Sequence, residues 1–138
     1  MVDVGMRQLR RSSDRLGRRG EDLAGSDDHA TAGLLLFYSA ECGLKAEVMQ
    51  RMKLRDTSQL PSYLRTHDLR LLAKELRLSP QSQSALQGCA RPPNNGQAVH
   101  KVEPPALHEA WRYGADLEPD DEKQALDALR TLISESRK

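Results

Sequence analysis

Six arginines crowd into the first part of the chain, where their guanidinium groups could hold phosphates. Between positions 7 and 19 they face a single acid, Asp14, which gives this stretch a local charge of +5. Most of them recur every three or four residues, so on a helix they would line one edge beside the apolar stripe. Guanidinium forks bind phosphate oxygens in pairs, and such an edge could contact a nucleic-acid backbone. The candidate phosphate-binding residues are Arg7, Arg11, Arg15, Arg18 and Arg19.

The same arginines have a second interpretation, which the sequence leaves open. They could form a solvated face whose charge is balanced by the acids of the last predicted helix. No aromatic residue lies among them, so the pattern does not indicate base stacking at this place.

Glu41 and Lys45 are a second candidate pair, set within the most apolar stretch of the chain. On a helix, position 41 falls on the inward side, where a carboxylate is costly to bury. Lys45 follows four residues later, in the order that favours an ion pair. The pair either fixes the register of its helix or takes part in recognition or assembly.

His67 precedes Asp68 at a predicted helix start, with Arg65 and Arg70 nearby. It is either a cap or turn residue, or a proton donor or acceptor beside guanidinium groups. The spacing of the four histidines does not suit zinc, and two cysteines are too few for a disulfide framework. The glycines are isolated and form no phosphate-binding loop. We therefore expect no metal, no cofactor, and reduced, mostly buried thiols at Cys42 and Cys89.

The composition bounds the kind of protein that these residues belong to. A chain of 138 residues most simply forms one domain spanning 1–138. Hydrophobic residues make up 38% and charged residues 30%, and no apolar run reaches the length of a membrane span. We expect a soluble, cytoplasmic protein with no membrane contact. The net charge of +1 neither favours nor excludes a nucleic-acid partner.

The periodicity is helical almost throughout, and strand patterns are nearly absent, which predicts an all-α fold. We expect an antiparallel bundle of about four main helices plus a short one. The predicted helices cover 3–24, 28–54, a segment capped by Thr66 and ended by Ser79-Pro80, a short segment from Pro80 through Cys89, 107–113, and a last helix from about 119. Gly17 and Gly20 should weaken the second half of the first helix, which we expect to fray or bend.

Residues 91–105 contain four prolines and no helical period. A loop of this length is uncommon in a small domain and is often functional or mobile.

The segment from Phe37 to Ala46, with Glu41, Cys42, Leu44 and Lys45 inside it, resembles the second-helix signature of the HEPN superfamily. His67-Asp68-Leu69 is similar to the helix start that follows in such proteins, and Trp111, Arg112 and Tyr113 are similar to the pattern ahead of their last helix. The order and rough spacing agree over residues 28–137.

The resemblance implies an up-and-down helical bundle that is often dimeric. It also implies a bacterial setting of RNA cleavage, nucleotide binding, toxin–antitoxin pairs or phage defence. The matching positions that would face a cleft are Glu41, Lys45, His67, Arg112 and Tyr113. Active ribonucleases of the superfamily carry Arg, four to six residues, then His, and that motif is absent here.

These observations lead to three hypotheses. The first is a non-catalytic, HEPN-like domain that binds RNA or a nucleotide, or that docks on a nucleic-acid-acting partner as a homodimer or hetero-complex. The second is a metal-independent endoribonuclease with a rearranged site, whose catalytic candidates are His67, His108 and Arg112. The third is a small helical scaffold subunit of a larger complex.

Overall fold

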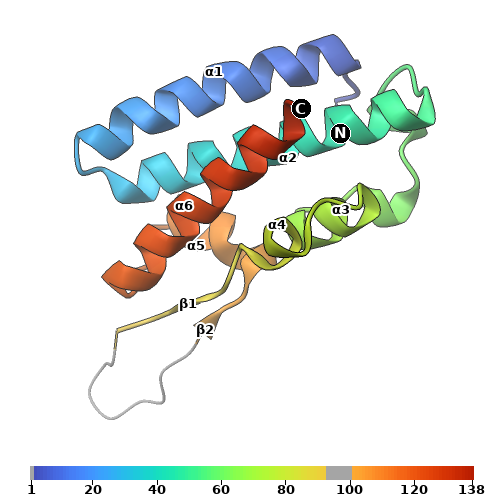
Figure 1. The fold of residues 1–138 in the computed structure, drawn as a ribbon. Helices are drawn as coiled ribbons and strands as arrows, with labels where there is room; N and C mark the ends of the chain where they lie inside the picture. The colour runs from blue at the N-terminus through green and yellow to red at the C-terminus, as the bar shows by residue number, and fades with distance from the viewer. Residues whose placement is uncertain (1, 93–100) are drawn as a thin grey trace.

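The computed structural model describes residues 2–92 and 101–138, and helices dominate this part of the chain. Figure 1 shows the arrangement of α1 (Met6–Gly25), α2 (His29–Met52), α3 (Leu69–Glu75), α4 (Pro80–Ser84), α5 (Leu107–Arg112) and α6 (Pro119–Ser136). Short 3-10 turns lie at Thr57–Gln59, Ser62–Leu64 and Pro104–Ala106. The predicted predominance of helix is confirmed. The one difference in type is a minimal hairpin of β1 (Cys89–Ala90) and β2 (Lys101–Val102), too short to leave a pattern in the sequence.

The first two helices lie side by side and antiparallel, joined by a tight turn at 26–28 (Figure 1). The Asp28 carboxylate accepts a hydrogen bond from the Thr31 N–H at 3.2 Å, as a helix cap does. The preceding residue, Asp27, has a φ of 64°, which lets the chain reverse. The helix start predicted at this place is confirmed.

Gly17 and Gly20 of α1 pack closely against α2, and the expectation that they fray or bend the helix is wrong. The helix continues without a break to Gly25. A Cβ placed at Gly20 would lie 2.9 Å from Leu36 Cγ, and one at Gly17 would lie 3.0 Å from Ser39 Oγ. The missing side chains therefore let the two helix backbones approach closely, and this packing compensates for the low helix propensity of glycine.

Buried hydroxyls fix the register of the same pair of helices. Ser13 Oγ donates to the Ser39 carbonyl at 2.8 Å, and Ser39 Oγ donates to the Ser13 carbonyl at 2.6 Å. Both side chains are buried, so a shift of one helix along the other would leave two hydroxyls without partners.

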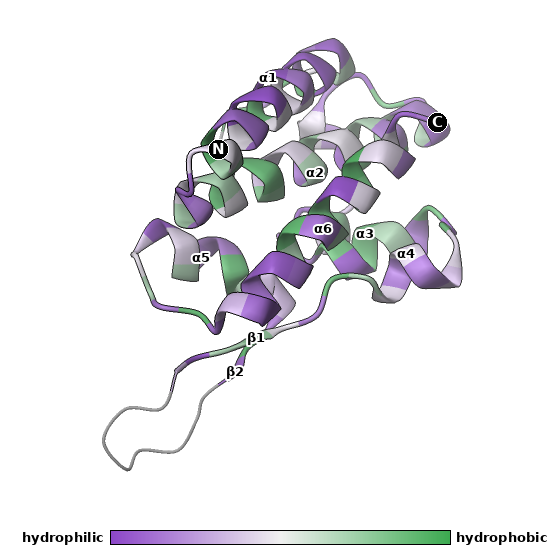
Figure 2. Ribbon diagram, turned by 60° about the vertical axis from the view of Figure 1, so that its left-hand side comes forward, coloured by the Kyte–Doolittle hydropathy of each residue, from purple (hydrophilic) through white to green (hydrophobic). Residues whose placement is uncertain are grey.

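The central element is α2, which is covered by α1, α3, α5 and α6. Its buried residues therefore lie on every side of the helix rather than along one stripe. Met52, its last residue, is 43% exposed. Figure 2 shows the contrast between this helix and the outer helix α1, most of which is hydrophilic.

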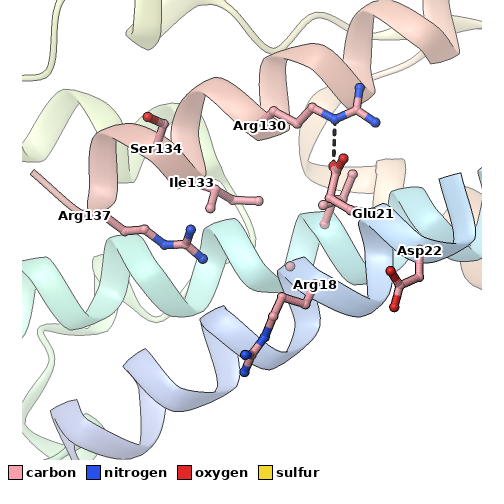
Figure 3. Close-up of a pocket in the computed structure, with 9 residues that line it drawn as sticks. Arg18, Glu21, Asp22, Arg130, Ile133, Ser134 and Arg137 are labelled. Carbon is pink, nitrogen blue, oxygen red and sulfur yellow. Dashed lines mark hydrogen bonds and ion pairs between the residues drawn. The ribbon is translucent and has the colours of Figure 1, made fainter. Parts of the chain in front are cut away.

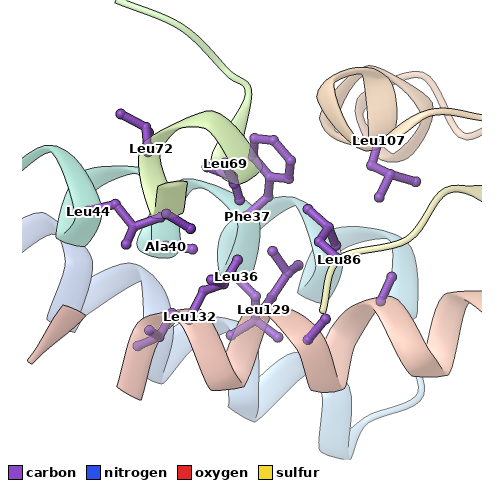
Figure 4. Close-up of a cluster of buried hydrophobic side chains, with 14 of the residues drawn as sticks. Leu36, Phe37, Ala40, Leu44, Leu69, Leu72, Leu86, Leu107, Leu129 and Leu132 are labelled. Carbon is purple, nitrogen blue, oxygen red and sulfur yellow. The ribbon is translucent and has the colours of Figure 1, made fainter. Parts of the chain in front are cut away.

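The last helix crosses α2 and leaves a gap beside α1 that side chains bridge. Figure 3 shows Arg130 of α6 reaching Glu21 of α1, where the Nε–Oε1 distance is 2.7 Å. Beneath this bridge, α6 presents Leu129 and Leu132 to Leu36 and Ala40 of α2, while Leu69 and Leu72 of α3 close the core from the other side (Figure 4).

The predicted third helix is shorter than expected at both ends. The Asp68 carboxylate accepts hydrogen bonds from the backbone N–H groups of residues 70 and 71, so Asp68 is the cap and the assignment of Thr66 is wrong. Thr66 Oγ1 accepts the Asp68 N–H at 3.0 Å instead. The helix ends where Arg77 adopts a φ of 53°, a left-handed conformation typical of helix C-termini.

The short helix predicted from Pro80 through Cys89 ends at Ser84, and Cys89 belongs to β1. Of the Pro-rich segment 91–105, residues 93–100 lie outside the described residues. The expected loop is replaced at 101–102 by β2 and at 104–106 by a 3-10 turn, where prolines fit because the first turn needs no N–H donor.

The start of the chain is tied to the connection that follows α2. The Val4 N–H donates to Thr57 Oγ1 at 3.1 Å, and the Thr57 N–H donates back to the Val4 carbonyl at 2.9 Å. Gly5 and Asp56 form an isolated antiparallel bridge beside them. In residues 2–92 and 101–138, none of the helices combines the length and apolar character needed to cross a bilayer.

Candidate functional site

The predicted phosphate-binding arginines lie on the outer face of α1. Arg7, Arg11, Arg15, Arg18 and Arg19 are all exposed. The helix buries Leu9, Ser13, Gly17 and Gly20, which lie on the opposite side at about 100° per residue. The arginines therefore lie on the side of α1 away from its buried residues, so the expectation that they flank the apolar stripe is wrong, and Arg18 also lines the cavity between α1 and α6. We call these five residues the arginine face.

Acids of the last helix do not balance this face, so that interpretation is wrong within the part of the chain that the structure describes. The pairing runs the other way, since α6 supplies arginines to the acids of α1. Arg130 pairs with Glu21 at 2.7 Å, and Arg137 pairs with Asp14 at 3.0 Å. The sixth arginine, Arg10, turns toward α2 and pairs with Glu47 at 3.0 Å.

None of the five residues of the arginine face makes an ion pair or side-chain hydrogen bond with the described residues. The arginines of α1, α2 and α6 that do pair are Arg10, Arg51, Arg130 and Arg137. The arginine face thus presents five guanidinium groups whose N–H donors are open to solvent or to a ligand.

A polar cluster forms a second candidate site, beginning at the predicted pair of Glu41 and Lys45. Lys45 Nζ lies 3.1 Å from Glu41 Oε2, and the two side chains are 15% and 13% exposed. The expected partly buried ion pair is therefore confirmed. The other carboxylate oxygen, Oε1, lies 2.6 Å from Nδ1 of His67, which the residues before α3 bring over α2.

His108 lies beneath His67 and joins it to α5. The two imidazole rings have centroids 4.3 Å apart, and the ring of His108 also packs at 5.1 Å on that of Phe37. His108 Nδ1 lies 3.3 Å from the hydroxyl of Tyr38 and 3.4 Å from a guanidinium nitrogen of Arg112. Arg112 also donates a hydrogen bond to the Tyr38 hydroxyl.

The three proposed catalytic candidates are thus brought together, although they come from distant segments. We use the name polar cluster for these six residues: Tyr38, Glu41, Lys45, His67, His108 and Arg112. Exposure differs within the cluster: His108 is only 3% exposed, whereas the His67 side chain is 52% exposed. His67 and the exposed Arg112 are therefore the members that a ligand would reach first.

Only some of the residues predicted to face a cleft line a common pocket. A small pocket of about 200 Å³ is lined by Glu41, Lys45 and His67, together with residues from the start of the chain and the connection after α2. Arg112 lies on the other side of the cluster and does not line this pocket. Tyr113 is 76% exposed, and its ring centroid lies 5.8 Å from the Arg112 guanidinium carbon. It belongs to the rim of the cluster rather than to a common cavity.

The packing of α5 on α2 determines the positions of His108 and Arg112. The two residues are four positions apart, so they share one face of α5. Trp111, on the neighbouring face, lies against Gly33 of α2 and donates its indole N–H to Glu122 of α6 at 3.0 Å. The tryptophan therefore anchors the short helix between two long ones.

Sequence reasoning missed Tyr38 as a member of the site. Its ring does pack on Phe37 and His108, but its hydroxyl joins the polar cluster. Its position three residues before Glu41 on a helix was the available signal, because such residues share a face.

The structure gives the polar cluster the means to move protons and hold an anion. Glu41 accepts the Nδ1 proton of His67, which leaves Nε2 of this exposed imidazole as a base. Arg112 adds a permanent positive charge on the other side of His108, within 3.4 Å of its Nδ1. Proton transfer next to a bound anion is therefore the chemistry that this arrangement can support.

Burial lowers the pKa of His108 below its ordinary value of 6.5, and the nearby charges of His67 and Arg112 lower it further. Glu109 and Glu41 oppose this shift. The neutral form of His108 is thus favoured, which agrees with an Nδ1 that accepts hydrogen bonds from Tyr38 and Arg112.

This shift predicts a dependence of stability on pH. As the pH falls below about 6.5, unfolded His108 takes up a proton before folded His108 does, so the free energy of unfolding should decrease. The decrease should be complete below the lowered pKa of the folded state. Urea unfolding of the wild type and of His108→Gln between about pH 5 and pH 8 measures it. The difference between the two profiles should grow toward high pH, and parallel profiles would contradict the prediction.

Burial raises the pKa of the Cys42 thiol to about 11 and that of Cys89 to about 12. Both thiols are free, and they are protonated at neutral pH, so neither is a ready nucleophile. Among the described residues, no three or more His, Cys, Asp or Glu side chains are grouped so that they could hold a metal ion. Comparisons with protein-family models, with curated proteins and with solved structures find no match to this chain.

Proposed function

We propose that this chain is a HEPN-like domain that binds RNA through the arginine face of α1. The observation that supports the proposal is the set of five exposed guanidinium groups on one helix, without acidic partners in the described residues. In the setting that the resemblance implies, the domain acts as a homodimer or in a hetero-complex with a nucleic-acid-acting partner of a toxin–antitoxin or defence system.

The physical basis is the phosphate backbone of RNA. Guanidinium groups that neutralise phosphates release the counterions condensed on them, and this release favours binding at low salt. Arginine forks hold two phosphate oxygens at once, whereas the absence of aromatic residues on this face argues against sequence readout by stacking. The expected binding is therefore directed at the backbone and depends little on sequence.

A salt titration with a labelled single-stranded RNA tests this function. If the five arginines each contact a phosphate, the logarithm of the affinity should fall by about 3.5 for each tenfold increase in salt, at about 0.7 per contact. The double variant Arg11→Gln, Arg15→Gln should reduce this slope by about 1.4. Arg70→Gln, an exposed arginine on α3, is the matched control and should leave the slope unchanged.

A flat salt profile for the wild type, or equal slopes for the double variant and the wild type, would contradict binding by the arginine face. Assembly with a partner that is indifferent to RNA would then favour the scaffold function instead.

A second candidate function is metal-independent cleavage of RNA, and the polar cluster favours it. Glu41 orients His67 so that Nε2 can take the proton of a ribose 2′-hydroxyl, and Arg112 stands where it can stabilise the charge on the attacked phosphate. His108 is buried and positions His67 from below. Because the ribonuclease motif of active HEPN proteins is absent, this site would be a rearranged one.

A further inference from the structure

A cavity lies between α1 and α6, away from the polar cluster and bordered on the α1 side by Arg18 of the arginine face. Figure 3 shows it, with α1 on one side, α6 on the other and α2 beneath. Its volume is about 550 Å³, which lies within the range of small-molecule sites, about 300–1,000 Å³. We call it the α1–α6 groove, and the residues that matter for its chemistry are Gly17, Glu21, Leu36, Arg130, Ile133 and Arg137.

The shape of the groove follows from the close packing at one of its ends. Near the C-terminus of α6, a Cβ at Gly43 would lie 2.5 Å from Ser136 Oγ and 3.1 Å from Ser13 Oγ, so three helices converge there. Away from this point α1 and α6 diverge, and the ion pair of Arg130 with Glu21 bridges them. The groove is the space that this divergence leaves.

The floor and one wall of the groove are apolar. Leu36 of α2 lines the groove from beneath, and Ile133 of α6 points into the space between α6 and α1 (Figure 3). On the opposite wall, Gly17 of α1 has no side chain, and Arg18, Glu21 and Asp22 of α1 line the rest of it. An apolar body that covered Leu36 and Ile133 would remove apolar surface from water, which favours binding.

The guanidinium group of Arg137 lies at the end of this apolar floor and has more N–H donors than its ion pair with Asp14 uses. One Nη atom of Arg137 lies 3.6 Å from the position of a Cβ at Gly17, so the guanidinium extends into the groove. Its one partner among the described residues is Asp14 at 3.0 Å, and the two side chains are 50% and 59% exposed. Such an exposed pair is weak, and a guanidinium has five N–H donors, so an incoming anion can share it.

We propose that the α1–α6 groove binds a small amphipathic organic anion. Its apolar body lies on Leu36 and Ile133, and its carboxylate, sulfonate or phosphate group binds Arg137. The proposed contacts use Ile133 and Arg137, which belong neither to the arginine face nor to the polar cluster, although Arg18 of the arginine face also lines the groove.

Titration of the full chain with anilinonaphthalene sulfonate, a fluorescent aromatic anion, tests the proposal. Saturable binding should weaken about tenfold in Arg137→Gln, which loses a charge-assisted hydrogen bond, and about fivefold in Ile133→Ala, which loses apolar contact. Arg70→Gln, an exposed arginine of α3 that lines no part of the groove, should bind the dye as the wild type does. Thermal melts of each variant verify that it is folded.

Amide NMR spectra locate the bound dye and separate the proposal from general hydrophobic binding. Shifts should concentrate at Gly17, Leu36 and Ile133, and shifts centred elsewhere would overturn the proposal. Equal displacement of the dye by inorganic phosphate and by an aromatic carboxylate at the same concentration would also overturn it, because the apolar body would then contribute nothing.

Discussion

Gly33→Ala is expected to lower the free energy of unfolding by about 2–3 kcal/mol, because the added methyl group overpacks the core. A Cβ at this position would lie 2.4, 2.6 and 2.8 Å from three atoms of the Trp111 indole. Distances under 3.0 Å require something to shift. The indole cannot shift freely, since it is 3% exposed and its N–H is bonded to Glu122.

Urea unfolding followed by the fluorescence of Trp111, the only tryptophan in the chain, measures this loss and reports on the contact itself. Gly25→Ala is the matched control, because no atom lies within 4 Å of the Cβ that it adds. This control should stay within about 0.5 kcal/mol of the wild type or exceed it, given the better helix propensity of alanine. Equal stability of the Gly33 and Gly25 variants would show that the indole can move aside.

The same substitution should also disturb the polar cluster, since Trp111 anchors the helix that carries His108 and Arg112. A displaced α5 would separate His108 from His67, whose ring centroids are now 4.3 Å apart. Core packing and the candidate chemistry are therefore linked through one glycine.

If the second candidate function holds, His67→Ala should reduce RNA cleavage by at least about 100-fold, the low end of what a general base contributes. The 2′-hydroxyl oxygen would attack the adjacent phosphorus as its proton passes to His67 Nε2, and the bond to the 5′-oxygen would break. That oxygen takes a proton from water or an acid, and the products are a 2′,3′-cyclic phosphate and a 5′-hydroxyl end.

Incubation of labelled RNA in EDTA, with analysis of the product ends, measures this reaction. Glu41→Gln should reduce cleavage less than His67→Ala does, because the imidazole remains and loses only its orienting carboxylate. His29→Ala is the matched control, since this exposed histidine lies outside the polar cluster. Circular dichroism confirms that each variant is folded. Absence of cleavage by the wild type would contradict this function and leave RNA binding as the conclusion.

Local signals in the sequence predicted the long helices well. Asp28 caps α2, and Pro119 with the acids that follow it opens α6, because both signals act through neighbouring backbone groups. The roles of Gly17 and Gly20 could not be predicted in this way. Helix propensity makes each a weak point, whereas the close approach of α1 to α2, a tertiary effect, makes each a contact.

The same distinction between local and tertiary effects applies to the candidate site. The pair of Glu41 and Lys45 was predictable, since four residues on a helix place the two side chains together. The contact of His67 with His108 was not, because it depends on how α5 docks on α2 through Trp111. Likewise, the direction of the arginine face was not predictable, because it depends on small residues of α1, rather than large apolar ones, packing against α2.

The tie between the start of the chain and the connection after α2 has a consequence for how the molecule opens. Chain ends usually fray one residue at a time. Here two hydrogen bonds between Val4 and Thr57 join the start of α1 to the segment after α2. The turn at 26–28 joins the two helices at their other end. Detaching α1 therefore requires breaking both ends of a loop together, so the amide hydrogens of α1 should exchange as one cooperative unit rather than in a gradient from the terminus.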